Sequence, residues 1–314
     1  MKNKFIDIVM WFVWVPLRKV LVSIPHPLTV YMLKALSFML YLVDVERRKG
    51  VEEELRLLMG DRFNDREMKK VVKSSFYIFI TKVYENLLFG NATEKHFDRV
   101  AAFEGMENLD EALKKKKGVV LLSFHFGSFF LFMLGLGLKG YKINAMTGTP
   151  IIDGSSYIKN KMFELRKKEE HGYPFNILSV GTSLKPLVKA LRDNEIVGIV
   201  IDGRESTKQV AVPLFNRIGQ FSPGIFNLCL KTGAQILPVA PILGPGSMKH
   251  RLIIEPALEL TVTEDKEETL RINVEKFIGI FQKYIWDYPD HYAMTLYGIR
   301  KEAESGLIPP LFKD

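Results

Sequence analysis

The chain of 314 residues can bury a full hydrophobic core but is short for two independent enzymatic domains, so we expect one main domain with an attachment. Hydrophobic residues make up 47% of it and the mean hydropathy is +0.04, between the values of a freely soluble enzyme and a multi-span membrane protein. The net charge of +8 favours polyanionic partners: nucleic acid, an anionic lipid surface or an acidic carrier protein. The single cysteine, Cys229, excludes an internal disulfide and a cysteine-rich metal site, and its apolar neighbours predict a buried helix position.

The first forty-odd residues are the most hydrophobic part of the chain, with apolar runs at 5–17 and 28–43. Each run is shorter than the ~20 apolar residues that span a bilayer, and Asp7 and Lys34 interrupt them. No small-x-small cleavage site follows Leu17, so we favour an uncleaved membrane anchor over a signal peptide; helices that simply pack on the core are the alternative. The basic and aromatic residues around the runs suit a headgroup boundary that faces the cytoplasm: Lys2, Lys4, Trp11, Trp14, Arg18, Lys19, Tyr31, Arg47, Arg48 and Lys49.

Beyond this segment the pattern is helical to Phe97, and Asn64-Asp65 is a plausible N-cap for a long helix. Helices and strands then alternate. Expected helices cover 105–113, 184–192 and 224–232, and expected strands cover 119–124, 196–201, 235–240 and 251–256. The alternation predicts an α/β fold with a mainly parallel sheet flanked by helices and an N-terminal membrane-associated helical extension. We place the membrane-anchoring helices at residues 1–50 and the α/β domain at residues 51–314.

The strongest local signal is Ser123-Phe124-His125-Phe126-Gly127-Ser128, in which a histidine follows directly on a predicted buried strand. Ligands bind at the carboxyl ends of parallel strands because loops and helix N-termini converge there. A histidine at that edge can be a general base that takes a proton from an alcohol. A core histidine bonded to the backbone explains this feature alone equally well.

Two further polar groups could belong to the same site. Ile201-Asp202-Gly203-Arg204 follows another predicted strand, and its charges could orient a phosphate, stabilise a protonated histidine or form an ordinary surface ion pair. The expected helix at 158–170 is rich in Lys and Arg, and Arg166 is its best candidate to face inwards because it follows Met162-Phe163 at helical spacing. A solvated basic face is the commoner explanation for such a cluster.

The order of these segments resembles the bacterial lipid A biosynthesis acyltransferases, the lauroyl and myristoyl transferase group of the lysophospholipid acyltransferase superfamily. The resemblance covers nearly the whole chain and includes the His-Phe-Gly strand end, Asp202, the segments 212–216 and 233–239, and the tail at 284–289. It implies an enzyme on the cytoplasmic face of the bacterial inner membrane that moves an acyl chain from acyl carrier protein or acyl-CoA to a hydroxyl of a membrane glycolipid. No cofactor is implied, and a nucleic-acid partner is not expected because no recognisable binding module occurs.

The same resemblance implies roles for individual residues. His125 is the expected general base, and backbone amides near Gly127 are expected to hold the oxyanion. The residues expected to shape the reacting loop or line the substrate pocket are Gly127, Ser128, Arg166, Asp202, Gly203 and Arg204.

One departure from the family motif bears on activity. The motif is a His, four intervening residues, then Asp or Glu, and here the last position is Phe130. Asp202 and Asp153 are the candidate replacements for the missing acid that orients the histidine. The alternative is a catalytically silent, lipid-binding or scaffolding relative, which predicts no carboxylate within hydrogen-bonding reach of His125. The segment 212–216 also departs from the family pattern, so the identity of the acceptor lipid stays open.

Overall fold

The computed structural model describes residues 24, 26–88, 92–148, 164, 167–179, 183–203 and 208–313. The first apolar run at 5–17 and its flanking residues lie outside this set, as do Asp153, Arg166 and Arg204. The second apolar run forms α3 (His26–Val43).

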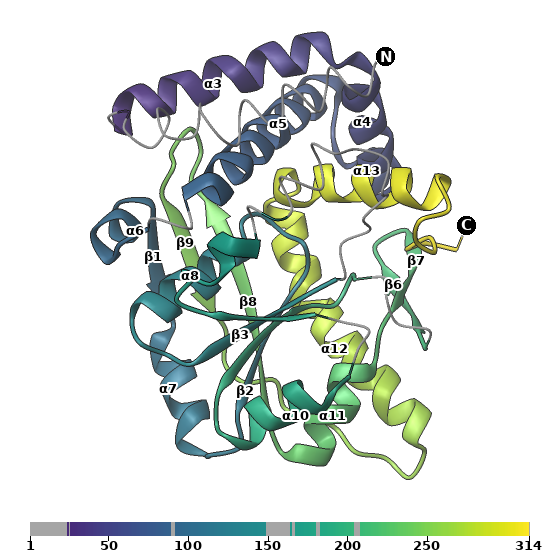
Figure 1. Cartoon of the computed structure of the whole chain (residues 1–314). Helices are drawn as coiled ribbons and strands as arrows, with labels where there is room; N and C mark the ends of the chain where they lie inside the picture. The colour runs from purple at the N-terminus through teal and green to yellow at the C-terminus, as the bar shows by residue number, and fades with distance from the viewer. Residues whose placement is uncertain are drawn as a thin grey trace.

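A seven-stranded sheet in the order β1-β9-β8-β2-β5-β3-β4 forms the centre of the described part (Figure 1). All neighbouring strands are parallel except β8 and β9, which pair antiparallel. The mainly parallel α/β architecture predicted from the sequence is therefore confirmed. The strands are β1 (Ala101–Glu104), β2 (Val119–Ser123), β3 (Ile143–Thr147), β4 (Asn176–Ser179), β5 (Ile196–Val200), β8 (Gln235–Leu243) and β9 (His250–Ile254).

Strands β2 and β5 lie side by side, and both are apolar runs that suit a sheet covered by helices on both faces. Their register pairs Ser123 with Val200, the last residue of each strand. Residues that lie equally far beyond the two strand ends therefore leave the sheet at the same level. His125 and Asp202 are two residues beyond these ends.

Helices cover both faces of the sheet. Alternate residues of β2 belong to different apolar clusters: Val120 and Leu122 to one, Val119 and Leu121 to the other. This alternation is the period of a strand buried on two sides. The covering helices are α6 (Glu94–Val100), α7 (Met106–Lys114), α8 (Phe130–Leu138), α10 (Lys185–Arg192), α11 (Gly224–Thr232) and α12 (Lys266–Asp287). Cys229 lies in α11, 1% exposed, and burial raises the pKa of its thiol to about 12, so the predicted buried helix position is confirmed.

A layer of helices lies at the top of the view in Figure 1: α3, α4 (Val45–Met59), α5 (Asp65–Leu88) and α13 (Asp290–Glu304). The predicted N-cap of α5 is present. Asn64 Oδ1 accepts hydrogen bonds from the backbone N–H groups of Arg66 and Glu67, and the Glu67 side chain accepts from the Asn64 N–H, which makes a capping box. Residue 50, the expected domain boundary, lies inside α4.

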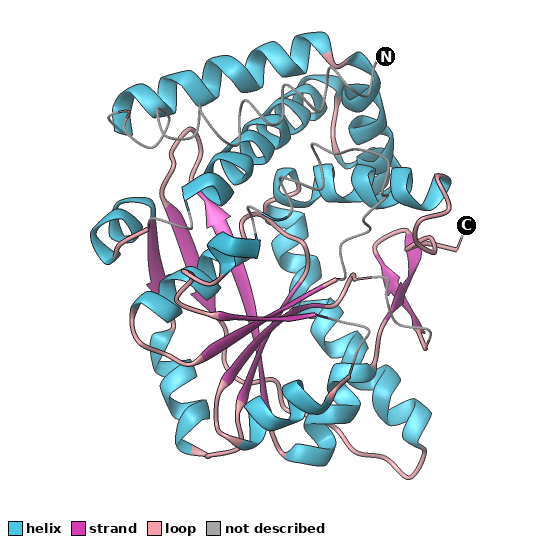
Figure 2. Cartoon of the chain, in the orientation of Figure 1, coloured by secondary structure: helices cyan, strands magenta, loops and turns pink. Residues whose placement is uncertain are grey.

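The segment 212–216 belongs to a separate hairpin of β6 (Val210–Leu214) and β7 (Arg217–Phe221), which stands apart from the central sheet in Figure 2. Phe215 in its turn has a φ of +53°. Its ring stacks on Trp286 of α12, with the ring centroids 6.0 Å apart. This unpredicted hairpin covers one side of α12.

Candidate active site

His125 and Asp202 lie together at the carboxyl ends of β2 and β5, where Nδ1 of His125 is 3.0 Å from Oδ1 of Asp202. The Asp202 side chain is 0% exposed, whereas the His125 side chain is 47% exposed. An ionised carboxylate can only accept, so Nδ1 carries the proton and Nε2 keeps its lone pair. The arrangement is a histidine–acid dyad with its basic nitrogen on an accessible ring.

Asp202 is held by several donors despite its burial. The backbone N–H of His125 donates to Oδ1 at 3.0 Å and to Oδ2 at 3.1 Å. The hydroxyl of Tyr292 donates to Oδ2 at 3.0 Å. Hydrogen bonds to charged acceptors contribute about 1.5–3 kcal/mol each, so these donors hold the Asp202 carboxylate firmly beside His125.

Gly127 gives the loop after His125 its sharp turn. Its φ is +52°, and a Cβ at this position would lie 2.8 Å from the carbonyl oxygen of Pro241. Its N–H donates to the carbonyl of His291 at 3.0 Å. The Gly127 N–H is thus engaged within the protein, and the expectation that backbone amides near Gly127 hold the oxyanion stays a prediction.

The Ser128 hydroxyl is engaged as well. It donates to Oε2 of Glu85 on α5, and Oε1 of Glu85 lies 2.5 Å from Nε2 of His250 on β9. All three side chains are buried. The hydroxyl thus anchors the reacting loop to α5, and the expected role of Ser128 at the substrate stays a prediction.

A basic side chain lies near the two buried carboxylates of this region. Lys82 stands one helical turn before Glu85 on α5 and is partly buried. Burial lowers the pKa of Lys82, while the charges of Asp202 and Glu85 act in the opposite direction. Lys82 and Glu85 were not among the residues predicted for the site, although an acid inside the apolar stripe of a predicted helix is a usable signal.

Gly203 directly follows the dyad acid and is partly buried. It has no side chain to offer a ligand, so any contact it makes must come from its backbone. Arg166 and Arg204, the two predicted cationic site residues, are outside the described residues, and their roles stay predictions.

The family model of the bacterial lipid A biosynthesis acyltransferases matches residues 2–296 of this chain. The chain belongs to this family. It is 23% identical over 289 residues to the lipid A biosynthesis lauroyltransferase of Escherichia coli, covering 88% of this chain and 90% of that protein. It is 19% identical over 248 residues to a lipid A biosynthesis acyltransferase of Haemophilus influenzae, covering 77% and 73%.

In this acyltransferase the position of the motif acid is occupied by an aromatic ring. Phe130 is the first residue of α8, and its ring lies 6.4 Å from that of Phe175 within an apolar cluster. The carboxylate comes from Asp202 on the neighbouring strand instead. The silent-relative alternative predicted no carboxylate within reach of His125, and the 3.0 Å contact contradicts that prediction.

Restoring the motif acid is therefore expected to bring no gain. In a Phe130→Glu variant the carboxylate would enter an apolar cluster, while Nδ1 of His125 already has its partner. We expect turnover no higher than wild type and a loss of about 1–3 kcal/mol in the free energy of unfolding, since a carboxylate would replace a partly buried ring that packs on apolar side chains. Phe130→Leu is the apolar control. Denaturant titration and acyl-transfer rates measure both effects, and a faster Phe130→Glu enzyme would contradict this account of the dyad.

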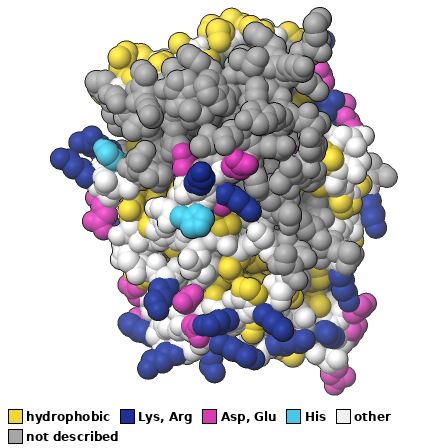
Figure 3. All heavy atoms as spheres, viewed as in Figure 1, with side chains coloured by type: hydrophobic (Ala, Val, Ile, Leu, Met, Phe, Trp, Pro, Cys, Tyr) yellow, Lys and Arg dark blue, Asp and Glu magenta, His cyan; other side chains and the backbone are white. Residues whose placement is uncertain are grey.

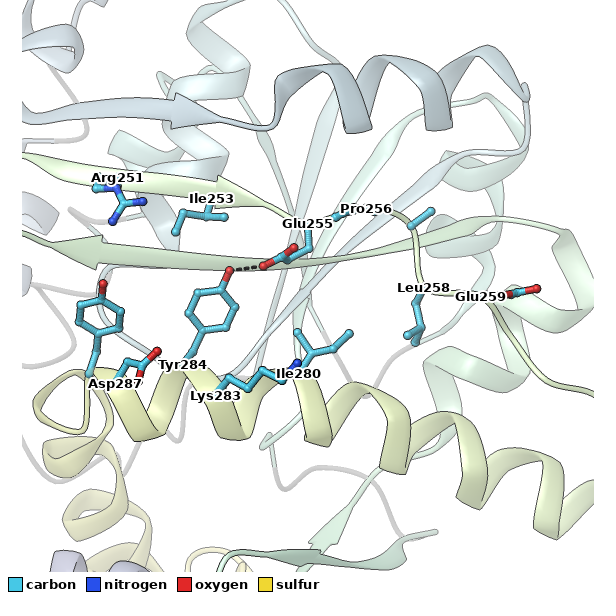
Figure 4. A pocket seen from close by; sticks show the side chains of 12 residues that line it. Arg251, Ile253, Glu255, Pro256, Leu258, Glu259, Ile280, Lys283, Tyr284 and Asp287 are labelled. Atoms are coloured by element: carbon cyan, nitrogen blue, oxygen red, sulfur yellow. Dashed lines mark hydrogen bonds between the residues drawn. The ribbon is translucent and has the colours of Figure 1, made fainter. Parts of the chain in front are cut away.

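A separate cavity of about 530 Å³ lies between β9 and the second half of α12 (Figure 4). Figure 4 shows the Tyr284 hydroxyl pointing to Glu255, to which it donates a hydrogen bond. Neither His125 nor Asp202 lines this cavity. We therefore do not assign it to the reaction.

Proposed function

We propose that this acyltransferase moves a fatty acyl chain from an acyl thioester, on acyl carrier protein or coenzyme A, to a hydroxyl of a lipid A-like glycolipid. The observation that carries the proposal is the contact of 3.0 Å between His125 Nδ1 and Asp202 Oδ1, on a ring that is 47% exposed. The names of the two relatives support a lipid A-like acceptor.

The dyad supplies what this reaction requires. Nε2 of His125 takes the proton of the acceptor hydroxyl while its oxygen attacks the thioester carbonyl carbon. Asp202 stabilises the imidazolium that forms. When the tetrahedral intermediate collapses, the C–S bond breaks and the imidazolium returns the proton to the departing thiolate. The products are an ester and a free thiol, with no net change in the enzyme.

The direct test is an acyl-transfer assay with the full-length protein in detergent or vesicles. Two thioester donors with a radiolabelled acyl chain, one on acyl carrier protein and one on coenzyme A, are tested in parallel. Purified lipid A-type glycolipid and phosphatidylglycerol are the separate acceptors. Label in the glycolipid alone supports the proposal, and the more efficient thioester identifies the donor. No transfer from either donor to the glycolipid would refute it.

We further propose that the protein works on the cytoplasmic face of the bacterial inner membrane. Several apolar side chains of α3 are exposed: Leu28, Tyr31, Leu36, Phe38, Met39, Leu42 and Val43. Figure 3 shows hydrophobic side chains along the top of the molecule, where α3 lies. A large exposed apolar patch is typical of a membrane or protein contact. Among the described helices none alone has the length and composition of a span, whereas 27–43 and 45–62, bent by 89°, meet that test together.

Charged substitutions on α3 are expected to weaken membrane binding. Met39 and Leu42 are 55% and 52% exposed, so burial of each in lipid contributes about half of the ~1.5–3 kcal/mol of a fully exposed side chain. A Met39→Asp, Leu42→Asp double variant should therefore bind anionic phospholipid vesicles at least about tenfold more weakly in flotation assays. Val262→Asp, at a 74% exposed position far along the chain, is the control and should bind normally. Equal binding of all three proteins would remove α3 from the membrane contact.

A further inference from the structure

The first two turns of α13 contact the reacting loop at three points. The carbonyl of His291 accepts from the Gly127 N–H at 3.0 Å. The Tyr292 hydroxyl donates to Oδ2 of Asp202 at 3.0 Å, and the Thr295 hydroxyl donates to the carbonyl of His125 at 2.6 Å. Both members of the dyad and the turn that follows them are thus tied to one helix.

This helix end is itself fixed. Tyr292 is 0% exposed, and its ring meets that of Phe124, the residue before His125, edge to face with 5.3 Å between centroids. His291 stacks on Phe126 at 5.2 Å and its Nε2 accepts from the Leu243 N–H at 2.8 Å. Its Nδ1 therefore carries the proton that it shares with the neighbouring Asp290 carboxylate.

We propose that Tyr292 and Thr295 are positioning residues of the transfer reaction: together they hold Asp202 and His125 in the geometry in which Nε2 can accept a proton. This inference rests on the proposed role of the dyad and adds the residues that orient it. Tyr292 and Thr295 stand three positions apart, so they lie on one face of α13. Both hydroxyls donate to members of the dyad, so we assign them to orienting the dyad and not to binding the acceptor lipid.

The Tyr292 hydroxyl fixes the carboxylate plane. Oδ1 faces Nδ1 of His125, and Oδ2 receives both the Tyr292 hydroxyl and the backbone N–H of His125. Without the hydroxyl, the carboxylate can turn about its Cβ–Cγ bond, and the Nδ1 contact loses its alignment. Misorientation of an acid–histidine pair slows proton transfer without weakening substrate binding.

A Tyr292→Phe variant keeps the ring and removes only the hydroxyl. We expect kcat to fall about 10- to 100-fold with KM within about twofold of wild type. Tyr141→Phe is the matched control, since it also removes a tyrosine hydroxyl that donates to an aspartate, Asp110 of α7. That variant should keep wild-type kcat.

Thr295 allows a conservative rescue. Thr295→Val removes the donor at nearly constant volume and should lower kcat about 3- to 30-fold, whereas Thr295→Ser keeps the hydroxyl and should restore most of it. If Thr295 had a purely structural role, Thr295→Val and Thr295→Ser would have equal kcat values, and only their melting temperatures would change.

A second readout does not depend on turnover. The Nδ1–H proton of His125, hydrogen-bonded to a buried carboxylate, should give a downfield proton NMR resonance that is absent in His125→Ala. In Tyr292→Phe this resonance should move upfield or broaden, and in Tyr141→Phe it should not. If wild-type protein shows the resonance but transfers no acyl chain, the proposed function fails and the positioning can still be tested. Unchanged resonance and unchanged kcat in Tyr292→Phe would overturn the positioning role.

Discussion

A His125→Ala variant is expected to lose acyl transfer by at least about a thousandfold in kcat, because it removes the group that takes the proton from the acceptor hydroxyl. The fold should survive the change. The side chain is 47% exposed, and the backbone N–H and carbonyl of residue 125, which bind Asp202 and Thr295, remain in place. The free energy of unfolding should fall by about 1–3 kcal/mol, because the buried Asp202 carboxylate loses one donor and keeps those from Tyr292 and the residue 125 N–H.

The measurement is the transfer assay with either thioester donor, together with a denaturant titration. His96→Ala is the control, since His96 is an exposed histidine near the start of α6 and far from the dyad in sequence. It should retain full activity. Should His125→Ala still turn over at more than a tenth of the wild-type rate, the dyad would not be the proton acceptor.

Asp202→Asn is expected to lower kcat by about 10²- to 10⁴-fold, for a reason that differs from loss of the base. The asparagine amide can donate to Nδ1 of His125, which would move the ring proton to Nε2 and leave no lone pair toward the acceptor. In the other orientation the NH₂ group faces the Tyr292 hydroxyl and the His125 N–H, two groups that now donate to Asp202. Either arrangement leaves a buried donor poorly satisfied, at a cost of about 1–3 kcal/mol in stability.

A double variant separates the two effects. If the residues act as one unit, His125→Ala with Asp202→Asn should be no slower than His125→Ala alone. Asp193→Asn serves as control, since Asp193 pairs with Lys189 at the surface after α10. Rate losses that multiply in the double variant would show that Asp202 acts independently of His125.

Much of the fold could be predicted because the signals are local. A few consecutive residues are enough to indicate the Asn64 cap, the end of α11 at Gly233, and the apolar runs of β2, β5 and β8. The structure has each of these elements within a few positions of the prediction. The antiparallel β9 could not be assigned in this way, because an apolar run of strand length does not reveal the direction of its neighbour.

The site was predictable in part for the same reason. His125 and Asp202 could be predicted as site residues because each follows a buried strand. Their contact depends on β2 and β5 being neighbours, which no local sequence pattern predicts. Asp202 and Asp153 were therefore left as alternatives. Three further residues reach the site through packing of whole helices: Glu85 contacts Ser128 from 43 residues away, Tyr292 contacts Asp202 from 90, and Thr295 contacts His125 from 170.

The contacts from α13 also constrain when the enzyme can become competent. The chain is synthesised from the amino end, so β2 and β5 can pair long before residues 292 and 295 exist. Until those two residues leave the ribosome, Asp202 and His125 lack two of their hydrogen-bond donors. Proton-accepting geometry at the dyad is thus completed only after residue 295 has left the ribosome, and a nascent chain that ends before α13 should stay inactive.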